Sequence, residues 1–221
     1  MAYTDYVIPR IAAGLVKAHE LLEPAKAGWV VADAPKHTHS RRWIHRPDAF
    51  ASDPFGEQTV RAMMHPGYQN ATYVEPAGPV DSSLTLLSIQ STEGRPICVL
   101  ANFSMHYFGS SGGFSADYFG DFAGYLEEQL SHEDSAAPRF VAIMSQGTSG
   151  DLHWMDYAQP ERKDYSRRQY AQELGEIALK SLQGIQYRTD IDLAMAETRF
   201  TLARRLPSSA RLTWAESIEK N

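Results

Sequence analysis

The sequence predicts an α/β fold with a mixed β-sheet flanked by helices. Two strand-like apolar runs, 96–106 and 140–144, enclose a helix-like stretch at 116–131. The first run ends at His106, and the second leads into a Gly-Asp turn at 150–151. A strand, a helix and a second strand in this order are typical of α/β enzymes, which place polar groups at the carboxyl edge of the sheet. We therefore expect this edge to carry the chemistry of the chain.

The spacing of apolar residues predicts the other elements in order. Apolar residues that recur every three or four positions indicate helices, and shorter apolar or alternating runs bounded by turn residues indicate strands. A Thr-Glu-Gly-Arg-Pro turn at 92–96 joins two of these strands as a hairpin. The expected helices are 5–22, 116–131, 165–184 and a last one over 212–218, and the expected strands are 28–32, 84–89, 97–105, 140–144 and 191–202.

The stretch 33–80 shows a different pattern. It is rich in Pro, His, Arg and Asn, and its apolar residues have weak periodicity. Long irregular stretches inside a compact domain usually form functional loops. We expect functional loops or wrapping segments in this region.

Composition limits the class of protein. At 221 residues, with 43% hydrophobic and 22% charged residues, the chain is long enough for one ordinary globular domain over 1–221, or for part of a larger one. The net charge of −6 argues mildly against a nucleic-acid partner. No apolar run is long enough to span a membrane, and no signal peptide is visible. The single cysteine, Cys98, lies in an apolar run and is expected to be a small core residue.

The predicted edge brings together four ionisable side chains from distant parts of the sequence, namely His106, Asp117, Asp151 and His153. Neutral imidazole suits zinc, but no HExxH or CxxC motif is present, so spacing alone does not establish a metal site. The turn 147–151 presents backbone N–H groups that suit an anion or an oxyanion, unless it is a plain turn.

Two motifs that precede these segments in the sequence can each be interpreted in two ways. His37-Thr-His39 has the spacing of a metal-binding pair on a strand, but its polar surroundings and Pro35 favour a loop without metal. Arg41 and Arg42 are suited to hold a carboxylate or phosphate, or are surface charges.

Several segments in collinear order resemble the neutral, non-lysosomal ceramidase family of zinc-dependent amidases. These segments are Ala18–Ala25, Ser40-Arg41-Arg42-Trp43, Glu75–Asp81, Asn102-Phe-Ser-Met-His106, Ser115–Gly120 and Phe140–Asp151. The resemblance runs over nearly the whole chain. It implies the zinc-hydrolase domain of a ceramidase-like protein, and an exported, periplasmic or extracellular location.

The resemblance also implies roles for individual residues. The family holds one zinc ion through two histidines, a glutamate and a tyrosine, and His106 corresponds to one of these histidines. The other ligands would lie outside residues 1–221, so we expect this chain to be a fragment. Arg41 takes the position of the arginine that contacts the substrate oxygen, and Ser40 stands where the family usually has asparagine. We expect Asp117 to orient His106 or to cap the turn.

One departure from the family bears on activity. The family's nucleophilic serine is replaced here by His153, which cannot take over acyl transfer without rearrangement. We therefore expect a zinc-activated water to attack an amide, or an ester, of a small or lipid-like substrate other than ceramide. Arg41, Asp151 and His153 are the expected catalytic residues, and Gly150 and Tyr107 join Arg41 in contacting the substrate.

Two alternatives remain open. One is a catalytically inactive relative that binds a lipid or carbohydrate at the same cleft. The other is a structural or interaction domain, in which the polar residues of the edge merely cap loops.

Overall fold

The computed structural model describes residues 2–109, 112–131 and 138–219. It divides into two units, Met1–Asp190 and Ile191–Asn221. The expectation of a single domain over 1–221 stays a prediction. The candidate site belongs to the first unit, which is described first.

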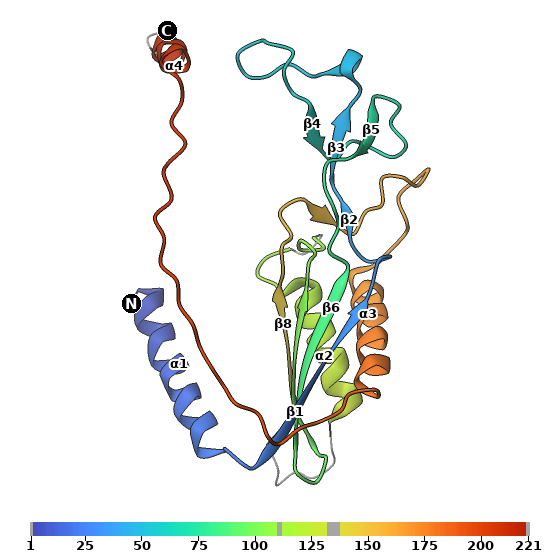
Figure 1. Ribbon diagram of the computed structural model, residues 1–221, viewed down its shortest axis with the longest axis vertical. Helices are drawn as coiled ribbons and strands as arrows, with labels where there is room; N and C mark the ends of the chain where they lie inside the picture. The colour runs from blue at the N-terminus through green and yellow to red at the C-terminus, as the bar shows by residue number, and fades with distance from the viewer. Residues whose placement is uncertain (1, 110–111, 132–137, 220–221) are drawn as a thin grey trace. The chain divides into compact units, whose positions relative to one another are not determined.

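A four-stranded mixed sheet forms the centre of this unit (Figure 1). Its spatial order is β1 (Ala25–Asp33), β6 (Ser83–Ser91), β7 (Pro96–Phe103) and β8 (Val141–Gln146). β1, β6 and β7 are antiparallel neighbours, whereas β7 and β8 run parallel. The predicted α/β class with a mixed sheet is confirmed.

Helices α2 (Asp117–Leu130) and α3 (Arg167–Leu182) cover one face of the sheet (Figure 1). Alternate strand residues point toward these helices, because successive side chains of a strand face opposite sides. The fully buried side chains of this layer include Leu84, Leu86, Val99, Phe103, Phe122, Leu126 and Leu174. Both helices lie where the spacing of apolar residues predicts them.

The opposite face of the sheet is exposed in the described structure. Val141 and Ile143 of β8 are 45% and 54% exposed, while Ala142 and Met144 between them are buried. A fully apolar run such as 140–144 is typical of a strand that is buried on both faces. This expectation is wrong for one of the two faces of β8. Apolar sequence alone does not show whether a second layer covers a strand.

The region 33–80 contains short strands that weak periodicity did not reveal. β3 (Arg42–His45) pairs with β4 (Ala62–Met64) and β5 (Tyr73–Pro76) in a separate three-stranded sheet. β2 (His39–Ser40) pairs with β9 (Leu152–His153). A single-turn 3₁₀ helix, η1 (Pro47–Ala49), follows β3. Strands of two to four residues are too short for alternation to be recognised.

The remaining elements lie at the two ends of the chain. α1 (Tyr3–Glu20) agrees with its predicted range and has no buried residue. In the second unit, α4 (Ser209–Glu219) forms as predicted, but the strand expected over 191–202 is absent: those residues are exposed and belong to no strand. None of the described helices is both long and apolar enough to cross a membrane.

Candidate functional site

The polar edge lies beyond the carboxyl ends of β7 and β8. Because these strands are parallel neighbours, with Phe103 opposite Gln146, they end at the same edge. His106 follows β7, and the turn 147–151 follows β8. The structure thus places His106 and the Gly-Asp turn at one edge of the sheet.

Arg41 connects three segments at this edge. Its backbone N–H donates to the carbonyl of Asp151 at 2.8 Å, and its own carbonyl accepts from the N–H of His65 at 2.7 Å. Its guanidinium donates to the carbonyl of Gly150, from Nη2 at 2.7 Å and from Nε at 3.2 Å. The Gly-Asp turn therefore fixes both the backbone and the guanidinium of Arg41, and Arg41 fixes the backbone of His65.

Three histidines lie around Arg41, namely His65, His106 and His153. The rings of His65 and His153 meet edge to face, with centroids 5.5 Å apart. Burial lowers the pKa of His153 to about 4, and His65, Arg41 and His106 add to this effect. Desolvation followed by the Arg41 charge also lowers the pKa values of His106 and His65. All three rings are therefore mainly neutral at pH 7.

Hydrogen bonds at Nδ1 determine which ring nitrogen carries the proton. His106 Nδ1 accepts from the backbone N–H of Tyr107 at 2.9 Å, and His153 Nδ1 accepts from that of Met155 at 3.3 Å. His65 Nδ1 lies 2.5 Å from the hydroxyl of Tyr157, whose pKa burial raises to about 12. This hydroxyl also donates to Met155 Sδ at 3.6 Å, so its contact with His65 does not fix the tautomer of that ring. A neutral imidazole that accepts at Nδ1 carries its proton at Nε2.

Arg41, His65, His106 and His153 therefore form what we call the donor cluster. Each side chain offers at least one N–H group, and the rings of His106 and His153 have no free lone pair in this hydrogen-bonding arrangement. The backbone N–H groups of Ser149 and Gly150 also have no acceptor within the described part of the chain. Such a set suits a carboxylate, a phosphate or an oxygen that gains negative charge during a reaction.

One residue of the donor cluster and one residue next to it have left-handed backbone. His65 has φ 56° and Asp117 has φ 52°, a conformation that non-glycine residues seldom adopt. The Asp117 carboxylate accepts from the N–H groups of Phe108 and Gly109 at 2.6 and 3.0 Å. Asp117 thus caps the turn after His106, one of the two roles that the sequence suggested for it. Strain of this kind is often found at functional sites.

The other predicted site residues lie next to the cluster. Tyr107 is 56% exposed, and its ring centroid is 4.4 Å from that of His106. Gly150 and Asp151 are exposed and contribute backbone carbonyls to Arg41. The catalytic and substrate-binding roles of these residues stay predictions.

His65 was missed by sequence reasoning. His65 belongs to a His-Pro-Gly turn within the stretch 33–80. No periodicity or motif pointed to it, because its position depends on the pairing of β3 with β4 and on its left-handed backbone.

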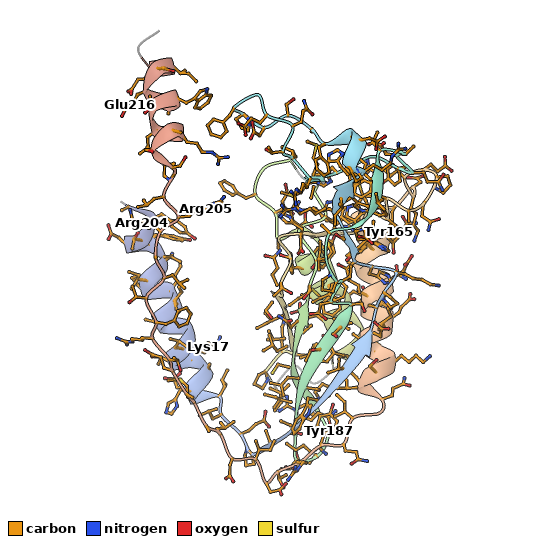
Figure 2. The ribbon with its side chains drawn as sticks, turned by 45° about the horizontal axis from the view of Figure 1, so that its top comes forward. Lys17, Tyr165, Tyr187, Arg204, Arg205 and Glu216 are labelled. Atoms are coloured by element: carbon orange, nitrogen blue, oxygen red, sulfur yellow. The ribbon has the colours of Figure 1, made fainter. Side chains whose placement is uncertain are left out.

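His37 and His39 do not form a pair. His37 is buried, and its Nε2 lies 3.1 Å from Glu173 Oε2, a carboxylate that also accepts from the hydroxyl of Tyr165 (labelled in Figure 2). His39 lies on β2 opposite His153. The two histidines thus contact different elements.

The described residues do not fit a complete zinc site. Among them, no group of three His, Cys, Asp or Glu side chains is placed to hold a metal ion. Zinc binds an unprotonated imidazole nitrogen, so ligation through His106 Nε2 requires the ring to give up the hydrogen bond from Tyr107. Zinc with further ligands from outside this chain stays a prediction.

A pocket borders the site on the side of β9. It has a volume of about 690 Å³, which is within the usual range for small-molecule sites. Its walls include Trp154 and Met155, directly after His153, together with Tyr68 and Arg162. The hydroxyl of Tyr68 is buried without a hydrogen-bond partner among the described residues.

Two solved structures are similar to this chain in the course of the backbone. The first is the neutral ceramidase from Pseudomonas aeruginosa, with 14% identity and a TM-score of 0.46 over 79% of this chain and 24% of that one. The second is a ceramidase complexed with C2, with 16% identity and a TM-score of 0.48 over 77% and 23%. The chain thus spans about a quarter of these proteins. Because the identities are this low and both TM-scores are below 0.5, the similarity says nothing about function, which we infer from the side chains of this chain alone.

No family model and no curated protein matches the sequence. The ceramidase family assignment stays a prediction.

Proposed function

We propose that this chain carries part of the active site of a hydrolase that cleaves an amide or ester bond. The observation that supports this function is the donor cluster, in which one arginine and three neutral histidines lie together at the sheet edge. Hydrolysis of an acyl bond passes through a tetrahedral intermediate with a negative oxygen. Donors fixed in advance around that oxygen are among the largest contributions to catalysis.

The residues divide the reaction between them. The carbonyl oxygen of the substrate accepts hydrogen bonds from Arg41 and the imidazole Nε2–H groups. A water molecule adds to the carbonyl carbon, and its proton passes to the carboxylate of Asp151. The bond to the amine or alcohol then breaks, and the leaving group takes the proton from Asp151. The pocket beside β9 holds the part of the substrate that does not react.

The sequence predicts zinc with His106 as the ligand from this chain, and this is an alternative to the donor role of His106, because a zinc-bound Nε2 would no longer donate. When bound, zinc would polarise the carbonyl or activate water. Metal analysis of the purified protein, followed by titration with zinc, tests this part separately.

Hydrolysis of acyl esters and N-acyl anilides by the full chain and its variants tests the proposed function. We expect Arg41→Ala to lower kcat on the order of 100-fold or more, because it removes a donor to the oxyanion. Arg42→Ala is the matched control, since Arg42 is exposed on β3, and should retain activity within about threefold. Equal activity in the two variants would contradict the proposal.

An inactive relative that binds a lipid or carbohydrate is the second candidate. The observation that favours it is that the rings of His106 and His153 have no free lone pair to act as a base. It predicts that a fatty-acid carboxylate binds and that Arg41→Ala weakens this binding. It also predicts no turnover of any ester or anilide in the panel.

A further inference from the structure

The exposed face of the four-stranded sheet carries a continuous apolar row. Trp29 pairs with Leu87, Leu87 with Leu100, and Leu100 with Ile143, so the row crosses all four strands. These side chains are 59%, 37%, 42% and 54% exposed. The parallel row Ala27, Ile89, Cys98 and Val141 lies next to it. Apolar surface of this extent on a sheet usually marks an interface.

Helix α1 carries an apolar stripe that has no partner in the described structure. Ile8, Ile11, Leu15 and Ala18 recur at intervals of three or four residues and so share one side of the helix. α1 has no buried residue, and Ile8, Ile11 and Leu15 are each more than half exposed. Glu20 and Lys17, the latter labelled in Figure 2, lie outside this stripe. An amphipathic helix gains most of its stability by burying such a stripe.

The connection between helix and sheet is short and fixed. Only Leu21–Pro24 separate α1 from β1. Within this connection, Glu23 forms a half-buried ion pair with Arg95, on the turn between β6 and β7. The end of α1 is therefore attached at the end of the sheet where β1 begins. An 18-residue helix is about 27 Å long, and the nine residues of β1 span about 30 Å, so the lengths match.

From these observations we propose that α1 packs with its apolar stripe on the exposed face of its own sheet and forms a third layer. The occupant is this helix because a four-residue connection keeps it at a high effective concentration next to that face. A separate molecule has no such advantage. The layer would cover the row from Trp29 to Ile143 on the side opposite α2 and α3. This proposal is independent of the proposed function.

Cys98 provides a direct test, because it is the one cysteine of the chain and lies on the exposed face. Cys98 is in register with Ala27, two residues beyond the start of β1 and near the attached end of α1. We expect Ala18→Cys in the full chain to form an intrachain disulfide with Cys98 under mild oxidation. In the control Glu20→Cys, the new thiol lies on the opposite side of the helix, and the same disulfide should form at least tenfold more slowly. Peptide mapping by mass spectrometry under non-reducing conditions identifies the bond.

Equal rates in the two variants would overturn the proposal, as would disulfides that mainly join two chains. The second result would make another copy of the chain the occupant. Two variants without an introduced cysteine test the docking of α1 independently. Leu15→Glu should displace the helix and raise the fluorescence of an apolar dye several-fold, whereas Lys17→Glu should leave it unchanged. No increase with Leu15→Glu would also contradict the docking.

Discussion

The helix-covered layer of the sheet and the polar edge beyond it consist of opposite kinds of residues. In the layer, Leu84, Phe103 and Phe122 are fully buried and apolar, so burial itself stabilises the fold. At the edge, His153 is 7% exposed, and burial disfavours its charged form. The layer therefore accounts for the stability of the chain. The edge costs stability and carries the groups suited to chemistry.

The largest expected effect is in the layer. Phe122→Ala should lower the free energy of unfolding by about 3–5 kcal/mol, because it removes a buried ring and leaves a cavity. Urea unfolding followed by circular dichroism measures this loss. Phe114→Ala, at a fully exposed phenylalanine, is the control and should change stability by less than about 0.5 kcal/mol. Similar losses in the two variants would remove the contrast between layer and surface.

The next effect belongs to the edge and depends on pH. His153 has a pKa of about 4 in the fold against 6.5 in the unfolded chain, so the unfolded chain binds more protons between these values. The free energy of unfolding is therefore unaffected by protonation of His153 above pH 6.5, and it decreases as the pH falls from 6.5 toward 4. The loss is on the order of 3 kcal/mol. His153→Gln should flatten this part of the stability curve. A variant with the same acid sensitivity as the wild type would show that His153 is not its source.

A smaller effect is expected at the start of α3. The side chain of Ser166 accepts from the N–H of Gln169, and Gln169 in turn accepts from the N–H of Ser166, which makes a capping box. Ser166→Ala should cost about 1 kcal/mol, while Ser166→Thr should cost only a few tenths. Thermal unfolding of the two variants measures the difference. Equal costs would show that the hydroxyl contributes nothing to the helix.

The helix-covered layer was largely predictable from sequence, whereas the region 33–80 and the stretch 191–202 were not. α2 and α3 follow from apolar residues at helical spacing, and the hairpin of β6 and β7 follows from its turn. The short strands of the region 33–80 escaped prediction, since their pairing depends on contacts between distant segments. The expected strand at 191–202 failed, because weak alternation does not form a strand without a partner.

The candidate site was predictable in part. The rule that parallel neighbours end at one edge placed His106 at the same edge of the sheet as Gly150 and Asp151. Arg41 was suggested, together with Arg42, as a group that holds an anion, and its position in the resemblance distinguished it from Arg42. The structure joins Arg41 to both residues of the turn. His65 could not be predicted as a site residue, because no sequence pattern indicates where a residue with left-handed backbone in an irregular stretch will lie.

The protonated nitrogen of each histidine tests the donor cluster most directly. Long-range ¹H–¹⁵N correlation spectra of the imidazole rings at pH 7.5 distinguish the two neutral tautomers and the charged form. His→Gln variants assign the signals of His65, His106 and His153. Neutral rings protonated at Nε2 are predicted for His106 and His153. If these two rings were protonated at Nδ1, with Nε2 free to bind a metal, the result would contradict their role as donors.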